Sequence, residues 1–282
     1  MVPPSAAALR ALVVGAVTWD VDAARPERPP RPGGTATIAA RVLARLGCRT
    51  GVVTRVATLD RAHLIEPLRR AGIDVLALPS SETTRYRNGY GPDDEDTHEL
   101  LAVSDPVRAG DVPADWLREA HLIHAGPLHP ADVEPGAAAG ASGIVGVDLQ
   151  GLVRGIAIAP PVVANGVRAW GEVATVVQAS ATDATVLFGT DVASRIRAAL
   201  GVPELLVTRG AAGATLATEG ETVTIPVPRV TGGDRRGAGD THLAVYLAAR
   251  ALGESPVRAA ALAGRVTARA LADGAVPAGA LG

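Results

Sequence analysis

The sequence predicts an α/β fold in which helices cover a mainly parallel sheet. Three observations carry this prediction. Apolar runs with the length of buried strands alternate along the chain with segments of helical periodicity. Hydrophobic residues make up 48% of the 282 residues and charged residues 20%, which predicts a sizeable buried core. Glycines or polar residues follow several expected strands, at the edge where open α/β sheets bind ligands.

The beginning of the chain supplies the first repeats of this alternation. The apolar run 11–17 is typical of a buried parallel strand, and two further strands are expected at 50–56 and 73–78. Helices are expected at 35–46 and 59–71, and a glycine follows each of them. This β-α-β-α-β order favours a parallel sheet.

Residues 81–104 interrupt the alternation. The segments 83–90 and 97–103 are typical of two short polar strands around an acidic turn at 93–96. Polar strands outside the main alternation favour a hairpin that projects from the core, such as a lid over a site. A surface hairpin without function is the alternative.

The rest of the chain continues the pattern with strands and Ala-rich helices. A short helix is expected from residue 115 to 120. Strands are expected at 121–125, 144–149, 173–178 and 205–210, a hairpin at 214–216 and 222–226, and helices at 241–252 and 256–271.

Composition excludes several classes of function. The formal net charge is -2 and aromatic residues make up 2%, so a nucleic-acid partner is not expected. Cys48 is the single cysteine, so an internal disulfide is excluded. The chain contains no lysine, which excludes a lysine-containing P-loop and a lysine Schiff base. No apolar run has the length of a membrane span and no secretion signal is recognised, so we expect a cytoplasmic protein without membrane contact.

The segment 231–242 is the strongest candidate for a site. Its glycines lie directly before an expected helix, where free N–H groups and the helix dipole favour an anion. Asp240 falls in the first turn of that helix. An anion site beside a carboxylate suits phosphoryl transfer to an alcohol, because the carboxylate can accept the hydroxyl proton. The alternative is a Gly-rich loop with a capping Asp.

Polar residues after other strands add candidates. Asp20 and Asp22 follow the first expected strand, and Gly33 and Gly34 precede the first expected helix. Asp20 is a candidate for holding a hydroxylated ligand, whereas Asp22 is better explained as a turn residue. A metal site shared by His121 and His124 is rejected, because that spacing puts the two side chains on opposite faces of a strand.

These parts, in this order, resemble the ribokinase/pfkB family of ATP-dependent sugar, cyclitol and nucleoside kinases. The resemblance runs from about residue 11 to residue 271, and Gly-Ala-Gly-Asp at 237–240 is its most specific motif. A softer resemblance to the branch that includes myo-inositol kinases lies in three segments. These are 101–107, 148–154 and 178–184.

The resemblance implies a single ribokinase-like domain over residues 1–282. Its fold would be a three-layer α/β/α sandwich with a mainly parallel sheet. A small β lid would come from about residues 18–32 and 82–104. Because lid strands in this family can pair between subunits, a homodimer through the lid is also expected.

The resemblance also implies site roles. Asp240 would deprotonate the accepting hydroxyl, and the N–H groups of Gly237, Ala238 and Gly239 would hold the phosphoryl group. The acceptor would be bound by Asp20, Gly33, Gly34, Thr37, Asn88, Gln150 and Arg154. ATP would be bound by Thr208, Arg209, Gly210, Gly213, Arg236, Gly237 and Gly239. Asp183 stands where the family has a Glu that organises Mg²⁺ through water.

Three positions depart from the family pattern. Ile38 and Ser180 each stand where the family often has Asn, and Arg236 replaces a Thr. The expected function is ATP-dependent phosphorylation of a neutral sugar or cyclitol, similar to myo-inositol. A nucleoside kinase and a non-catalytic member that binds a nucleotide or sugar are the alternatives. A nucleotide-binding oxidoreductase is disfavoured, because no G-x-G-x-x-G follows the first strand.

Overall fold

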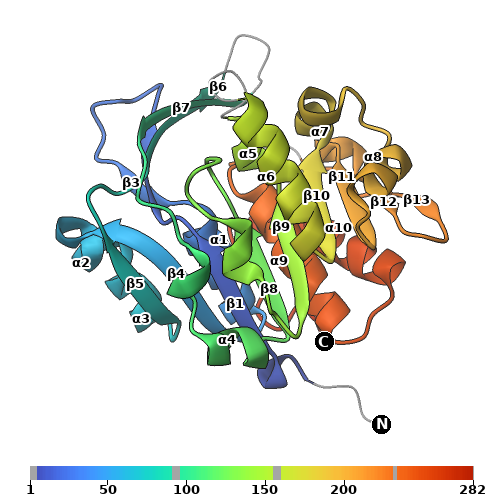
Figure 1. The fold of residues 1–282 in the computed structure, drawn as a ribbon, viewed down its shortest axis with the longest axis horizontal. Helices are drawn as coiled ribbons and strands as arrows, with labels where there is room; N and C mark the ends of the chain where they lie inside the picture. Colours follow the sequence, from blue (N-terminus) through green and yellow to red (C-terminus); the bar gives the residue numbers. More distant parts are fainter. Residues whose placement is uncertain (1–4, 91–95, 155–159, 231–233, 282) are drawn as a thin grey trace.

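The computed structural model describes residues 5–90, 96–154, 160–230 and 234–281, which form two sheets and the helices around them (Figure 1). The large sheet has nine strands. In spatial order they are β13 (Thr222–Ile225), β12 (Ala214–Ala217), β11 (Glu204–Thr208), β10 (Val176–Ser180), β9 (Ile144–Asp148), β8 (Leu122–Gly126), β1 (Arg10–Gly15), β4 (Arg49–Ala57) and β5 (Asp74–Ser80). Every pair from β11 to β5 is parallel, and β12 and β13 add an antiparallel edge. The predicted mainly parallel sheet is confirmed.

The smaller sheet has four strands and follows the carboxyl end of β1. Its order is β3 (Arg31–Gly33), β2 (Thr18–Asp22), β6 (Arg85–Tyr90) and β7 (Asp96–Ala102). Strand β2 pairs in parallel with β6, and β6 pairs with β7 as a hairpin. The predicted lid is therefore confirmed. Of the predicted acidic turn at 93–96, only Asp96 is among the described residues.

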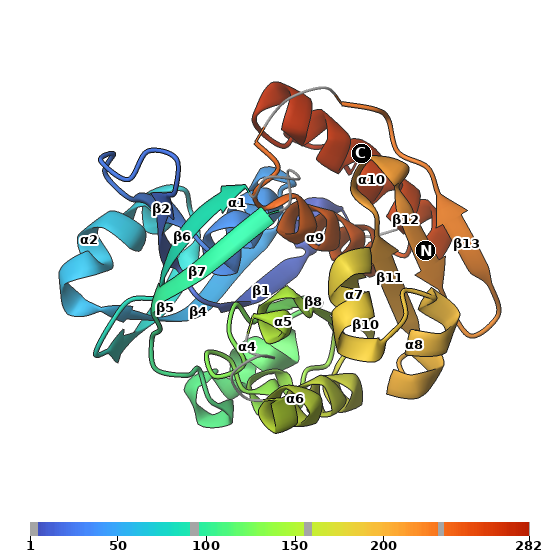
Figure 2. The same cartoon turned by 90° about the horizontal axis from the view of Figure 1, so that it is seen from above.

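Helices cover both faces of the large sheet (Figure 2). One face carries α1 (Thr35–Arg45), α2 (Arg61–Leu64), α3 (Glu66–Arg70), α9 (Ala238–Ala251) and α10 (Pro256–Asp273). The other carries α4 (Ala114–Glu119), α5 (Gln150–Val153), α6 (Pro160–Val173), α7 (Ala181–Phe188) and α8 (Ala193–Leu200). Alternate residues of β1 face the two layers, with Val13 in the first core and Val14 in the second.

Two helical regions differ from the prediction. The helix expected at 59–71 is split into α2 and α3, because Pro67 has no N–H group to continue the first helix. Helix α6 was not predicted, since its sequence begins with two prolines and contains Gly166 and Gly171, which disfavour helices. The helix buries Trp170 against the sheet, and this packing offsets the poor helix propensity of its sequence. Within the described residues, no helix has the length and hydropathy required to span a membrane.

Candidate active site

The loop before α9 carries the residues of the predicted anion site, of which 234–242 are among the described residues. Gly237 caps the helix with φ of 75°, in the left-handed region that favours glycine. A Cβ at this position would also lie 2.6 Å from Cδ1 of Ile38. The N–H of Ala238 donates to the carbonyl of Arg235 at 3.1 Å. Within the described residues the N–H groups of Gly239 and Asp240 donate to no backbone carbonyl, so they remain able to hold an anion.

Asp240 lies in the first turn of α9 and is only 4% exposed. Gln150 Nε2 donates to its Oδ1 at 3.3 Å. Burial raises the pKa of Asp240 to about 6, while the Thr35 hydroxyl and the Arg154 charge oppose this shift. Thr35 Oγ1 lies near enough to act on the carboxylate, although no hydrogen bond of standard geometry joins them. A carboxylate with this pKa is ionised at pH 7 and remains basic enough to accept a hydroxyl proton.

Asp20 lies in lid strand β2 and faces the same space. Thr18 Oγ1 donates to its Oδ1 at 2.7 Å. Its carboxylate lies over Gly33 in the paired strand β3, where any Cβ would overlap Asp20 Oδ2. Burial raises the pKa of Asp20, and the charges of Arg236 and Arg154 partly counter that effect. The structure thus brings Asp20, Gly33 and Asp240 to one site, and the negative charge of Asp20 contributes to the raised pKa of Asp240.

Arg154 supplies positive charge between these carboxylates. It follows α5 and places its guanidinium carbon 4.7 Å from the centre of the Tyr86 ring, a cation–π contact. Tyr86 belongs to the lid and donates its hydroxyl to the carbonyl of Leu128 at 2.5 Å. The charge of Arg154 opposes the rise in the pKa of both Asp20 and Asp240, which places it near each of them.

The structure adds Asp132, which was not predicted as a site residue. Its Oδ2 accepts the N–H of Leu128 at 2.9 Å, and within the described residues its buried Oδ1 has no hydrogen-bond partner. Burial raises the pKa of Asp132 to about 7, and Arg154 acts against this shift. Asp132 follows β8 at the ligand-binding end of the sheet, and this placement after an expected strand was the available signal.

A buried network of hydrogen bonds joins strands β9 and β10 to the first turn of α9. Gln178 of β10 donates from Nε2 to Asp148 Oδ2 at 2.6 Å and to the carbonyl of Gly239 at 3.0 Å. Its Oε1 lies 2.8 Å from Nδ1 of His242. Burial and the nearby Asp240 raise the pKa of Asp148 to about 7. Gln178 was not predicted as a site residue, because only the sheet register brings it under the loop. His242 lies in the predicted segment 231–242, on α9, but was given no role there.

A groove of about 560 Å³ leads away from the anion site. It is lined by Thr208, Gly210, Ala211, Gly213, Val227, Pro228, Val230, Arg235, Ala238, Gly239, His242, Gly264, Thr267, Ala268 and Leu271. Four predicted donor-site residues, Thr208, Gly210, Gly213 and Gly239, are among them. Gly213 has φ of 91°, and any Cβ there would overlap the carbonyl oxygen of Ile225. This glycine is required to bring the two walls together.

Comparison with known proteins decides the family. The model of the pfkB family of carbohydrate kinases matches residues 13–273. The chain belongs to the pfkB family of carbohydrate kinases. No curated protein sequence matches the chain.

Solved structures of the ribokinase family share this fold. A pyrophosphate-dependent kinase in the ribokinase family, complexed with a pyrophosphate analog and myo-inositol, matches with a TM-score of 0.78 and 22% identity over 96% of this chain and 97% of that one. Fructokinase from Vibrio cholerae O395, with fructose, ADP and calcium ion bound, matches with a TM-score of 0.78 and 21% identity over 94% and 93%. Ribokinase from Thermotoga maritima matches with a TM-score of 0.73 and 19% identity over 97% of each chain.

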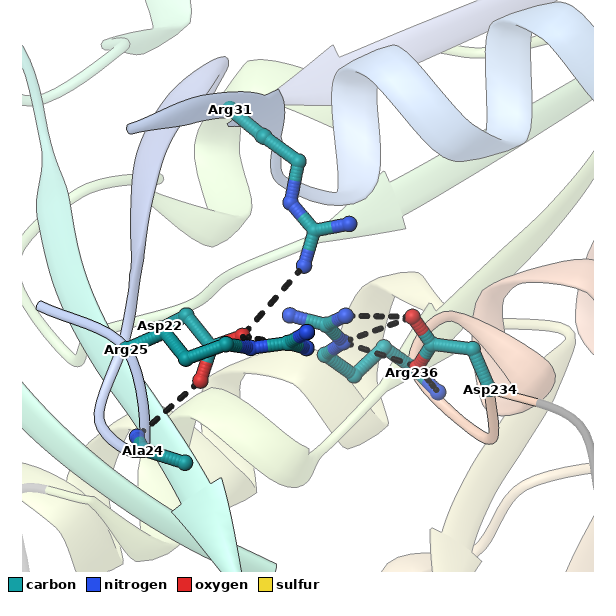
Figure 3. Close-up of polar contacts among 6 residues, drawn as sticks. All are labelled: Asp22, Ala24, Arg25, Arg31, Asp234 and Arg236. Carbon is teal, nitrogen blue, oxygen red and sulfur yellow. Dashed lines mark hydrogen bonds and ion pairs between the residues drawn. The ribbon is translucent and has the colours of Figure 1, made fainter. Parts of the chain in front are cut away.

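The side chain of Arg236, a departure from the family pattern, extends toward Asp22 and Arg25 of the lid (Figure 3). Its Nε donates to both carboxylate oxygens of Asp234, at 2.8 and 3.0 Å. Across the gap, Asp22 accepts hydrogen bonds from Arg25 at 3.1 Å and from the N–H of Ala24 at 3.0 Å. The latter contact agrees with the turn role predicted for Asp22. The positive charge of Arg236 also lowers the pKa of Asp22, so this guanidinium links the anion-site loop to the lid electrostatically.

Three other predicted site residues are not among the described residues that line the groove. Arg209 forms an ion pair with Asp191 and does not line the groove. Asn88 Oδ1 lies 2.8 Å from His98 Nδ1 within the lid sheet. Thr37 is buried in the first turn of α1, where Gly34 is the cap, and its hydroxyl has no hydrogen-bond partner among the described residues.

Asp183, predicted to organise Mg²⁺ through water, lies in the first turn of α7, directly after β10. Its Oδ2 accepts the Ser180 hydroxyl at 2.7 Å, and its charge contributes to the raised pKa of Asp148. Within the described residues, no cluster of three His, Cys, Asp or Glu side chains could hold a metal by itself. The residues therefore fit Mg²⁺ that takes most of its ligands from phosphates and water, with Asp183 and Asp148 beside it.

Proposed function

We propose that this pfkB kinase transfers the γ-phosphoryl group of ATP to a hydroxyl group of a neutral sugar or cyclitol, with Asp240 as the base. The observation that carries the proposal is the position of Asp240, buried at the start of α9, beside free N–H groups and with a raised pKa of about 6. A base and an anion site at one point are what this transfer requires.

The residues divide the reaction between them. The acceptor hydroxyl gives its proton to Asp240 as its oxygen bonds to the γ-phosphorus, and the bond to the bridging oxygen breaks to release ADP. The N–H groups of Gly239 and Asp240 lie at the helix start and stabilise negative charge on the transferred group. Mg²⁺, when bound, neutralises phosphate charge. Gln150 and Arg154 keep Asp240 oriented and ionised.

The acceptor side favours a neutral polyol. Asp20, Asp132 and Asp240 present carboxylates, and Arg154 lies near all three. Carboxylates accept hydrogen bonds from hydroxyl groups and repel a further anion. A cyclitol or hexose offers many hydroxyl groups at short spacing, so inositols head the set of acceptors to be tested. The solved pyrophosphate-dependent relative with myo-inositol bound supports the same order of testing.

The donor side favours ATP. The groove begins at the anion site and continues past apolar side chains such as Val227, Pro228 and Leu271. Its volume of about 560 Å³ lies in the range of small-molecule sites. Pyrophosphate would fill only the polar end beside Gly239. The fructokinase structure with ADP bound supports a nucleotide in this fold, whereas the pyrophosphate-dependent relative makes the donor a point for direct measurement.

The test is a coupled assay of ADP release with Mg²⁺ over inositols, hexoses, pentoses and nucleosides. We expect turnover with at least one cyclitol or hexose. We expect Asp240→Asn to lower kcat by roughly 10³-fold because it removes the proton acceptor. Asp273→Asn, an exposed carboxyl at the end of α10, is the matched control and retains the wild-type rate. A wild-type rate in Asp240→Asn contradicts the proposal.

Two other outcomes define the alternatives. Turnover restricted to nucleosides identifies a nucleoside kinase. Nucleotide binding by calorimetry, with no ADP formed across the whole panel, identifies a non-catalytic binding protein. A homodimer through the lid remains a further prediction, and the mass of the protein in solution, with and without a charged substitution in β7, tests it.

A further inference from the structure

The donor groove contains a polar atom that the proposed reaction does not use. His242 lies four residues after Ala238, on the face of α9 that lines the groove. The residue is 6% exposed, and within the described residues its Nε2 has no hydrogen-bond partner. Thr267 Oγ1, on α10, is a second buried polar atom of the same groove without a described partner. Buried polar atoms are normally paired, so these two point to a ligand in the groove.

The hydrogen-bond network determines the tautomer of His242. The carbonyl of Gly239 can only accept, so the neighbouring amide group of Gln178 must be its Nε2 end. The Oε1 of Gln178 therefore faces His242 Nδ1, and Nδ1 must carry the proton that this oxygen accepts. Burial lowers the pKa of His242 to about 4, so the ring is neutral at pH 7. It follows that Nε2 presents a lone pair and accepts hydrogen bonds.

We propose that the His242 Nε2 lone pair selects a phosphoryl donor that carries a nucleoside, by accepting a hydrogen bond from a hydroxyl or amino group of that nucleoside. The proposal rests on the proposed function, since it takes this groove as the donor site. Phosphate oxygens of fully deprotonated pyrophosphate only accept hydrogen bonds and cannot satisfy this atom. A nucleoside carries hydroxyl and amino donors, so only this class of donor pairs with His242.

The position of His242 agrees with that assignment. His242 lies one turn of α9 after the start of the helix. When the phosphates of a nucleotide are bound at Gly239, its nucleoside therefore extends toward His242. The surrounding walls are mainly apolar, and Gly264 lets them approach closely, since a Cβ there would lie 2.6 Å from Cγ1 of Val227. A flat base fits between such walls.

Calorimetry with ligand analogues tests the proposal without catalysis. The ligands are ADP, 2′-deoxy-ADP, 3′-deoxy-ADP, N6,N6-dimethyl-ADP and inorganic pyrophosphate, each with Mg²⁺. We expect one of the three analogues to bind the wild-type protein roughly 5- to 30-fold more weakly than ADP, because it lacks the donor that His242 pairs with. His242→Phe should weaken ADP binding by a similar factor, bind that analogue as tightly as ADP, and leave pyrophosphate binding unchanged.

His121→Phe is the matched control, because His121 is exposed and follows α4, at the opposite end of the sheet. The proposal is overturned if His242→Phe weakens ADP and pyrophosphate equally, since the ring then acts on phosphates or on the loop. Equal binding of all four nucleotides to the wild type also overturns it. If His242→Phe does not fold, the wild-type series decides alone. If no acceptor is phosphorylated but the analogue difference persists, the proposed function fails and the assignment of His242 stands.

Discussion

The two halves of the proposed active site are built in different ways. At the anion end of the donor half the residues are close in the chain, mainly the glycines of one loop and the first turn of α9. The groove beyond that end is lined by residues from several elements. The acceptor half gathers side chains from separate elements, with Asp20 in β2, Asp132 after β8 and Arg154 after α5. The donor half depends on backbone geometry, so single glycines matter there. The acceptor half depends on a balance of buried charges, so its side chains act on one another.

The largest effect is expected from Gly237→Ala, which tests the donor half. The substitution adds a Cβ at φ of 75°, which strains the backbone, and places it 2.6 Å from Ile38 Cδ1. We expect the loop to shift and misplace the N–H groups. We expect kcat to fall roughly 10²- to 10³-fold with a smaller change in the acceptor KM. Gly140→Ala, at φ of 81° with open space around it, is the control that carries backbone strain alone. Equal kinetic losses in both variants would mean that strain, and not the anion site, is responsible.

The next effect is expected from Arg154→Met, which tests the acceptor half. It removes the positive charge near Asp20, Asp132 and Asp240 and leaves three buried carboxylates without it. The acceptor KM should rise roughly 10- to 100-fold, and the KM for ATP should change little. Arg168→Met, on the exposed side of α6, is the matched control. A larger change in the KM for ATP than for the acceptor would remove Arg154 from the acceptor half.

These halves also differ in how far the sequence predicts them. The loop before α9, Asp20 and Gly33 were predicted because each belongs to a short motif next to a recognisable strand or helix. Gln178 and Asp148 are 30 positions apart in sequence, and they meet because β9 and β10 pair them directly in the parallel register. The only sequence signal for Asp132 is its place after an expected strand, since its burial near Arg154 is a property of the folded chain. The motifs and the family resemblance therefore predicted the loop before α9, Asp20 and Arg154. The roles of Asp132 and of the Gln178–Asp148 pair required the three-dimensional arrangement.

A smaller effect, on stability, is expected from Asp132→Asn. Burial raises the pKa of this carboxyl to about 7 in the folded protein, from an ordinary value of 3.8. The folded state therefore holds the proton more tightly, and stability is lost as pH rises from about 4 through 7. We compare the change in the free energy of unfolding that Asp132→Asn causes at the two pH values. This change should be about 1–3 kcal/mol more stabilising at pH 8 than at pH 5. Urea unfolding at both pH values measures this, and a variant less stable at pH 8 would show that the ionised carboxylate is held by Arg154.

The central claim is that Asp240, held near Asp20, Asp148, Arg154 and Gln150, accepts the proton of the acceptor hydroxyl. The most direct measurement is kcat/KM for the acceptor against pH in the wild type and in Arg154→Met. Because the base must be ionised, the rate should rise with pH through about 6 and then level off. Loss of the Arg154 charge raises the pKa of Asp240, so the rising part of the pH profile should move to higher pH. The ionisation of ATP is the same in both enzymes and cannot cause such a shift. A rise at the same pH in both enzymes, or one that persists in Asp240→Asn, would contradict the claim.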